Sequence, residues 1–234
     1  MEDSMKKIKR LIFFIIIISI IVGTILVLNG KKMYENALSE ISLSDKVEEI
    51  RTDSNFVKLD DLPKHYTNAI IAVEDNRYYE HGAIDIIAIG RAIWTNIRNL
   101  ELREGGSTIT QQVAKNLFFI YETDAVTRKI AEIFAAFDLE KNYSKSDILE
   151  LYVNTIYFGD GYYGIKEACK GYLDKEPSEM TLYDCTMMAG IPNAPSVYAP
   201  TANPELTRSR QKKVILDMVK HGYLSQVQAN SILE

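Results

Sequence analysis

The chain has 234 residues, of which 47% are hydrophobic and 25% are charged, and its formal net charge is −5. This length allows one domain of ordinary size with a small appendage, and it is long enough to bury a core. Twelve Gly and six Pro exclude a collagen-like or low-complexity chain, and the acidic balance argues against a general nucleic-acid binder. Two cysteines cannot form a disulfide framework, and no Cys or His cluster has the spacing of a zinc site.

An uncharged apolar segment occupies residues 11–28. Its length falls within the roughly 17–25 residues that a membrane-spanning helix needs. Four basic residues precede the segment, and two, Lys31 and Lys32, follow it. The positive-inside rule therefore predicts cytoplasmic residues 1–10, a transmembrane anchor at 11–28, and all later residues outside the cytoplasmic membrane. A cleaved signal peptide is the alternative, but its apolar core is usually about 7–15 residues and is followed by an A-x-A pattern, which this chain lacks.

The rest of the chain has the apolar spacing of helices, and strand alternation is nearly absent, so the predicted fold class is mainly α. Residues 29–60 are polar and weakly periodic, as in a stalk or a first helix, and residues 61–234 are predicted to form one domain. Asp85 and Ser107 are the expected N-caps of two of the helices. The expected helical segments are 66–73, 86–97, 107–116, 126–141, 146–157 and 208–221.

Residues 117–121 form a run of large apolar side chains, LFFIY, next to a polar helix. One interpretation is an ordinary segment of the core. The other is an exposed apolar lip that rests on the membrane beside the anchor. The sequence leaves both open.

The segment 105–116, GGSTITQQVAKN, is the most informative part of the chain. Two glycines before Ser-Thr give a flexible entry to a helix, and the free N–H groups at a helix start favour an anion such as phosphate. Five polar side chains fall on one helical face and on the stripe beside it: Ser107, Gln111 and Lys115, then Gln112 and Asn116. An ordinary solvated helix is the alternative, and the spacing alone does not decide between the two.

Glu74 and Asp75 end an apolar run, where a carboxylate can lose part of its hydration. Burial of this kind raises the pKa of a carboxyl group and suits it to general-base chemistry. The alternative is an acid pair in water at a helix end. His81 has no second His at a metal-ligand spacing, so it is expected to form hydrogen bonds and not to bind a metal.

Arg128 and Glu132 are four residues apart, with Lys129 between them. A surface ion pair at this spacing stabilises a helix by roughly 0.3–0.5 kcal/mol, and the cation-first order is the weaker one. A carboxylate flanked by two cations would instead suit the handling of a pyrophosphate leaving group. In the amphipathic segment 145–154, Glu150 and Asn154 are expected to be structural.

Together these segments resemble the family 51 glycosyltransferases, the lipid-linked peptidoglycan polymerases. Five stretches resemble the family's motifs in the family's order: EDNRYYEHGAID (74–85), GGSTITQQVAKN (105–116), RKIAE (128–132), ILELYVNTIYFG (148–159) and AGIPNAPSVYAP (189–200). The resemblance covers about residues 60–221. It implies a mainly α, lysozyme-like glycosyltransferase domain with a membrane-proximal jaw lobe, preceded by one transmembrane helix. The chain ends at Glu234, without room for a transpeptidase domain, so the monofunctional form is expected.

The resemblance implies an enzyme that polymerises lipid II into β-1,4-linked glycan strands and releases undecaprenyl pyrophosphate outside the cytoplasmic membrane. Glu74 would be the general base that deprotonates the acceptor's GlcNAc 4-hydroxyl, with inversion at the donor's anomeric carbon. Glu132 would be the second catalytic acid, on the donor side. The implied substrate-binding residues are Asp75, His81, Gly106, Ser107, Thr110, Gln111, Gln112, Lys115, Asn116, Arg128 and Lys129.

No residue is assigned as a metal ligand, although a divalent cation, Mg²⁺ or Mn²⁺, bridging the phosphates stays open. The expected partners are lipid II, the growing lipid-linked glycan, the cytoplasmic membrane and other cell-wall synthesis proteins, with no nucleic acid. Two alternatives remain. A lytic glycan-cleaving enzyme could use the same fold and the same pair of carboxylates. A catalytically silent scaffold for wall synthesis would need neither carboxylate.

The chain departs from the family pattern in three places. The loop 121–124 lacks an Arg that relatives often carry, and 173–175 reads Leu-Asp-Lys where an aromatic residue and a Gly are usual. Cys169 and Cys185 replace small apolar residues, and buried free thiols are expected there. A disulfide between them would require Cα atoms within about 7 Å.

Overall fold

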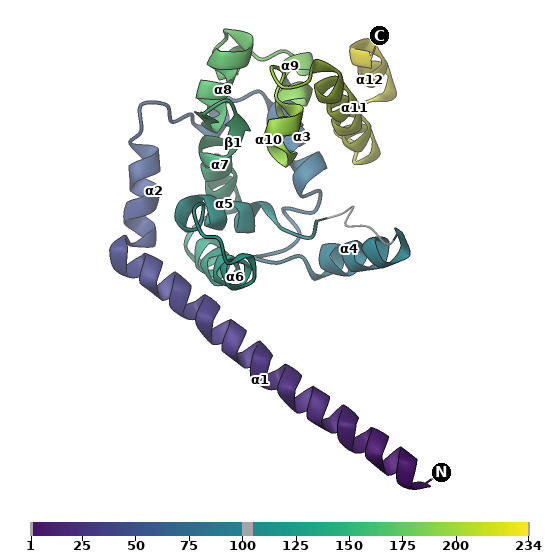
Figure 1. The fold of residues 1–234 in the computed structure, drawn as a ribbon. Helices are drawn as coiled ribbons and strands as arrows, with labels where there is room; N and C mark the ends of the chain where they lie inside the picture. The colour runs from purple at the N-terminus through teal and green to yellow at the C-terminus, as the bar shows by residue number, and fades with distance from the viewer. Residues whose placement is uncertain (1, 100–104, 234) are drawn as a thin grey trace.

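The computed structural model describes residues 2–99 and 105–233 and confirms the mainly α fold class (Figure 1). The α-helices are α1 (Glu2–Glu40), α2 (Leu43–Arg51), α3 (Lys64–Glu74), α4 (Ile86–Asn99), α5 (Ile109–Phe118), α6 (Ala125–Asn142), α7 (Lys145–Thr155), α8 (Gly164–Leu173), α9 (Leu182–Met188), α10 (Pro195–Tyr198), α11 (Pro204–Lys220) and α12 (Gln226–Leu233). Three short 3-10 turns are η1 (Leu59–Asp61), η2 (Pro177–Glu179) and η3 (Ile191–Asn193). Strands β1 (Tyr157–Gly159) and β2 (Tyr162–Tyr163) form a small antiparallel hairpin.

Helix α1 extends away from the folded body to the N-terminus (Figure 1). Among the described residues, it is the one helix long and apolar enough to cross a membrane. Residues 29–40, expected as a stalk or a first helix, continue α1 and pack against α6. The Tyr34 hydroxyl donates a hydrogen bond to Asp138 Oδ2 at 3.0 Å. The apolar helix is therefore joined to the body without an intervening loop.

The core of the body is built around α5, which packs against α6 and α7. Ile109, Val113 and Leu117 are buried along it, at the four-residue spacing that lines one helical face. Helix α3 packs against α9 and α11, which come from the C-terminal third of the chain. This arrangement brings the C-terminal end of α3 near the start of α5.

The predicted helices are all present, and Asp85 caps α4 as expected, since its Oδ1 accepts two backbone N–H groups of the first turn. The predicted cap of α5 is wrong. The N-cap is Thr108 and not Ser107, because the Thr108 hydroxyl and the Gln111 side chain form a reciprocal capping box. The Ser107 hydroxyl instead accepts a hydrogen bond from Lys129 Nζ at 2.8 Å. Helices α8, α9, α10 and α12 were not anticipated from the sequence.

The apolar run 117–121 divides between the two interpretations. Leu117 and Phe119 are buried in the core, whereas Tyr121 is 90% exposed. A larger exposed apolar face lies on α4, which projects from the body on the same side as α1 (Figure 1). Its members are Ile86, Ile87, Ile93, Trp94 and Ile97.

The departures from the family pattern have local explanations. Asp174 ends α8 in the left-handed conformation, with φ 51°, and so takes the backbone shape that a Gly usually provides. Cys169 and Cys185 are both buried and free, as expected. Asn154 and Glu150 were expected to have a structural role. The structure agrees, because both side chains form hydrogen bonds with the backbone of residues 57–59.

The β1–β2 hairpin provides a test of the fold, because Gly161 and Gly164 both have positive φ angles, 86° and 76°. A Cβ at Gly161 would meet open space, whereas one at Gly164 would lie 2.7 Å from the Asn154 carbonyl oxygen. We expect Gly161→Ala to destabilise the protein by about 1 kcal/mol through backbone strain alone. Gly164→Ala should cost about 2–4 kcal/mol because a steric clash is added. Thermal unfolding followed by circular dichroism measures both; equal losses would contradict the clash.

Candidate active site

A cleft of about 820 Å³ contains both carboxylates that the sequence singled out, Glu74 and Glu132. Its walls come from the end of α3, the start of α5, α6 and α11, so it joins segments that are far apart in the sequence. The other predicted site residues that line the cleft are Asp75, Gly106, Ser107, Gln111, Gln112, Lys115, Asn116, Arg128 and Lys129.

Glu74 is the last residue of α3, and its side chain is only 9% exposed. One carboxylate oxygen, Oε2, accepts a hydrogen bond from Gln112 Nε2 at 3.0 Å. The other, Oε1, is buried without a hydrogen-bond partner, and Arg210 Nη2 lies 3.7 Å from it. Burial raises the pKa of Glu74, while Gln112 and then Arg210 act to lower it. Of the two interpretations that the sequence left open, the structure agrees with desolvation and not with an acid pair in water, and one oxygen has no hydrogen-bond donor.

Glu132 lies in a different environment, although its side chain is also buried. Arg128 Nη1 donates to its Oε1 at 2.8 Å, and Lys129 Nζ donates to its Oε2 at 2.9 Å. The three side chains together carry one net positive charge at the cleft wall. This arrangement is not a solvated ion pair on the surface, because the Glu132 carboxylate is buried and both of its oxygens accept hydrogen bonds from cations.

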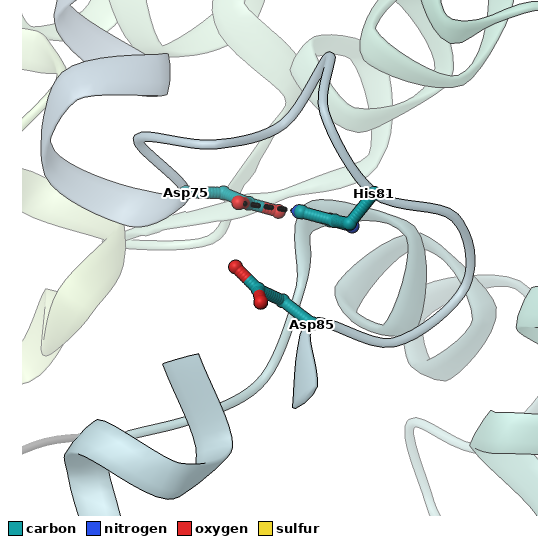
Figure 2. Close-up of side chains that lie close together, drawn as sticks. All are labelled: Asp75, His81 and Asp85. Atoms are coloured by element: carbon teal, nitrogen blue, oxygen red, sulfur yellow. Dashed lines mark hydrogen bonds and ion pairs between the residues drawn. The ribbon is translucent and has the colours of Figure 1, made fainter. Parts of the chain in front are cut away.

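Asp75, His81 and Asp85 form a cluster beside the cleft (Figure 2). Three potential ligand atoms of these residues lie within 4.8 Å of one another, which is compact enough for a metal ion. However, His81 Nε2 contacts Asp75 Oδ1 at 2.8 Å, and its Nδ1 contacts the Gly82 carbonyl oxygen at 2.7 Å. Both ring nitrogens thus already contact oxygen atoms of the protein, and neither is turned toward an open ligand position.

The carboxylate oxygens of this cluster also have hydrogen-bond donors within the protein. Asp75 Oδ2 accepts the backbone N–H of Ile109 at 3.1 Å, and Asp85 Oδ2 accepts Arg77 Nε at 3.0 Å. Asp85 Oδ1 caps α4. The donor set therefore fits a structural network that joins α3, α4 and α5 better than it fits a resident cation, and no chemistry is assigned here to a metal.

Two predicted site residues do not line the cleft. Thr110 is fully buried, and its hydroxyl donates to Glu140 Oε1 at 2.5 Å, on the side of α5 that faces the core. His81 reaches the cleft only through Asp75. Gln111 lines the wall, but its side chain is 2% exposed and caps its own helix. A role for these three residues in substrate binding stays a prediction.

Sequence reasoning missed the wall that α11 contributes. Arg210, Lys213, Asp217 and Lys220 line the cleft opposite the start of α5, followed by His221, whose Nε2 lies 3.2 Å from Asn76 Nδ2. The spacings of three, four and three residues place the first four on one helical face. That charged stripe within the predicted helix 208–221 was the signal that could have identified them.

Comparison with known proteins decides the family. The family model described as Transglycosylase matches residues 42–219. The chain belongs to this transglycosylase family. The resemblance to the family 51 glycosyltransferases is thereby confirmed. The family match runs from α2 into α11 and includes the residues of the cleft wall named above, except Lys220 and His221.

Penicillin-binding protein 1F of Bacillus subtilis is 38% identical over 242 residues, which cover 96% of this chain and 34% of that protein. The "Putative transglycosylase" of Cupriavidus necator is 40% identical over 182 residues, which cover 78% of each chain. The crystal structure of Penicillin-Binding Protein 1A from Haemophilus influenzae matches with a TM-score of 0.46 and 22% identity, over 76% of this chain and 17% of that one. The chain thus spans about a third of the Bacillus relative.

The hydrogen bond from Gln112 to Glu74 can be tested through the pH dependence of glycan transfer. The rate should fall as the pH is lowered. Because burial raises the pKa of Glu74, this fall should begin at a higher pH than the ordinary titration range of a glutamate. Gln112→Met removes a hydrogen bond that favours the ionised form, so the acidic limb of the pH profile of kcat/KM should move to higher pH. At alkaline pH much of the loss should be recovered.

The matched control for this experiment is Lys212→Ala, since Lys212 is exposed on α11 and does not line the cleft. Its pH profile should equal that of the wild type. An unshifted acidic limb in Gln112→Met, with a lower rate at every pH, would contradict an effect on the pKa of Glu74.

Proposed function

We propose that this protein is a peptidoglycan glycosyltransferase that polymerises lipid II into β-1,4-linked glycan strands and releases undecaprenyl pyrophosphate. The observation that carries the proposal is the contrast between the two carboxylates of one cleft. Glu74 is buried with a free oxygen and a raised pKa, whereas both oxygens of Glu132 are bound by cations. Glu74 is therefore suited to accepting a proton, and Glu132 to holding two cationic side chains in place.

On the acceptor side, Glu74 removes the proton from the GlcNAc 4-hydroxyl as that oxygen attacks the anomeric carbon of the donor, which is inverted. Gln112 holds Oε2 and thereby directs Oε1 toward the incoming hydroxyl. Orientation of this kind lowers the activation free energy because the base and the hydroxyl group are already held in a reactive geometry.

On the donor side, Arg128, Lys129 and Lys115 stabilise the negative charge that develops on the departing pyrophosphate. Two further donors are available, because Asn116 Nδ2 and Arg128 Nε are buried at the cleft without hydrogen-bond partners. Buried donors of this type are costly unless a ligand oxygen pairs with them. They support binding of an oxygen-rich, anionic donor.

A lytic enzyme is less well supported. Cleavage of a glycan expels a sugar alcohol, which needs a proton from a general acid. Glu74, whose pKa is raised, could supply that proton, but cleavage also needs a second carboxylate as base or nucleophile, and Arg128 and Lys129 hold both oxygens of Glu132. A pyrophosphate leaves without protonation, so one base together with a set of cations is sufficient for the transfer reaction.

The proposed arrangement in the membrane follows the sequence: residues 1–10 in the cytoplasm, a retained anchor at 11–28, a connecting segment at 29–60 and the glycosyltransferase domain at 61–234 outside. The exposed apolar face of α4 would then rest on the bilayer, where the lipid-linked substrates are held. Lipid II, the growing lipid-linked glycan, the cytoplasmic membrane and other wall-synthesis proteins are the proposed partners.

The polymerase proposal is tested with the purified full chain in detergent and labelled lipid II, with the products separated by size. Wild-type protein should produce a ladder that muramidase digests. Glu74→Gln should lower the rate by about 10²–10⁴-fold, because the base is lost while the shape is kept. Glu80→Gln is the matched control, since Glu80 belongs to the same segment but is exposed and lies outside the cleft wall.

Each other outcome points to a different function. No ladder in any detergent, together with full complementation by Glu74→Gln in cells, would support the scaffold. Shortening of preformed glycan would support the lytic enzyme.

The cations beside Glu132 can be tested separately from the base. Lys129→Ala removes a charge-assisted hydrogen bond to Glu132 and one positive charge from the proposed pyrophosphate site. We expect kcat/KM for lipid II to fall about 10- to 100-fold. Lys141→Ala, an exposed residue of the same helix outside the cleft wall, should leave the rate unchanged. Equal effects of the two substitutions would contradict the proposed donor site.

A further inference from the structure

The last turns of α1 pack directly on α6, the helix that carries Arg128, Lys129 and Glu132. Gly30 and Tyr34, one turn apart on α1, are both buried in this contact. The Tyr34 ring also packs edge-on against Phe118 and Phe119 at the end of α5. The apolar helix therefore contacts two of the elements that form the cleft.

The helices approach most closely at Gly30. A Cβ placed there would lie 2.5 Å from Ile130 Cγ2, 2.6 Å from Ile130 Cβ and 3.2 Å from the backbone nitrogen of Ala131. Rotation of the Ile130 side chain can move Cγ2 away from a Cβ at position 30. It cannot move the Cβ of Ile130, which is fixed to the backbone. A larger residue at position 30 must therefore displace one helix from the other.

The residue that follows Ala131 is Glu132, and Lys129 precedes Ile130. A displacement of α6 at this point moves the charged group at the cleft wall, because Arg128, Lys129 and Glu132 flank Ile130 and both cations donate hydrogen bonds to Glu132. Shifts of about 1 Å in groups that position a substrate can reduce a rate about 10²-fold.

We propose that Gly30 is a positioning residue: its contact with Ile130 lets α1 fix α6, and thereby Glu132 and its two cations, in the geometry that the reaction needs. The inference rests on the proposed function. It assigns to the apolar N-terminal helix a second role, as a support for the donor side of the cleft, in addition to anchoring the protein in the membrane.

The experiment compares Gly30→Ala with Gly23→Ala in the full-length protein. Gly23 is in the same helix, one heptad earlier, and a Cβ there would meet nothing within 4 Å. Ala is the better helix former at both positions, so neither substitution should unwind α1. We expect Gly30→Ala to lower kcat/KM for lipid II about tenfold or more, and Gly23→Ala to stay within about twofold of the wild type.

The double variant Gly30→Ala/Ile130→Gly separates positioning from general damage, with Ile130→Gly alone as its reference. It removes both Cβ and Cγ2 of residue 130, the two atoms nearest to the added Cβ, so it should relieve most of the crowding and restore most of the lost activity. Ile130→Phe should reproduce the loss from the other side of the contact, which keeps the test decisive if Gly30→Ala fails to fold. Equal activity of Gly30→Ala and wild type, equal losses in Gly30→Ala and Gly23→Ala, or no recovery in the double variant would each overturn the proposal.

A second measurement does not depend on catalysis. Hydrogen–deuterium exchange of residues 128–132 should be faster in Gly30→Ala than in the wild type and in Gly23→Ala. If the wild type fails to polymerise lipid II while this exchange difference is present, the proposed function is wrong and the support by α1 stands. If the wild type polymerises lipid II and Gly30→Ala changes neither exchange nor rate, the support is wrong and the function stands.

Discussion

Asp75 is the C-cap of α3 and, through Oδ2, accepts the backbone N–H of Ile109, the first residue of α5. The same carboxylate contacts His81 through Oδ1, so the end of one helix, the start of another and the loop between α3 and α4 meet at one side chain. Glu74 directly precedes Asp75, and Gln112 is in the first turn of α5. The distance between the carboxylate of Glu74 and the amide of Gln112 therefore depends on this junction, which neither helix could provide alone.

This junction also explains why the two acidic residues of the cleft differ. Glu74 is held at the end of a buried apolar helix, where α11 brings Arg210 to 3.7 Å from one oxygen but not into hydrogen-bond contact. Glu132 lies in the middle of α6, one turn after Arg128, and has cations on both oxygens. Two glutamates of the same intrinsic acidity thus have different environments because of their positions on helices.

Much of this arrangement could be predicted from local sequence. The apolar spacing predicts the long helices and the position of Asp85 predicts a cap, whereas the end of an apolar run left the burial of Glu74 open between two interpretations. The cap of α5 was also available in principle, because Thr108 and Gln111 have the spacing of a capping box and Ser107 does not. Ser107 and Thr108 both carry a hydroxyl group that suits an N-cap, so the residue type alone does not distinguish them.

Other features depend on tertiary packing and have no local signal. The approach of Arg210 to Glu74 joins residues 136 positions apart, and it exists only because α11 packs on α3. The core position of Thr110 depends on which face of α5 meets Glu140. Gly30 resembles Gly23 in an apolar helix, and only the position of Ile130 distinguishes them.

The charge distribution makes the apolar N-terminal helix important for more than attachment. Residues 29–234 contain 23 basic and 30 acidic residues, a net charge of −7, so the overall field of the body does not attract an anionic substrate. The positive charge at the cleft is local, from Lys115, Arg128, Lys129 and the basic stripe of α11. At physiological salt, charges of this kind act over about 8 Å. Under the proposed function, a helix that holds the body at the surface where the lipid-linked substrate diffuses would replace long-range attraction with proximity, and the cleft would then need only short-range contacts to bind its anion.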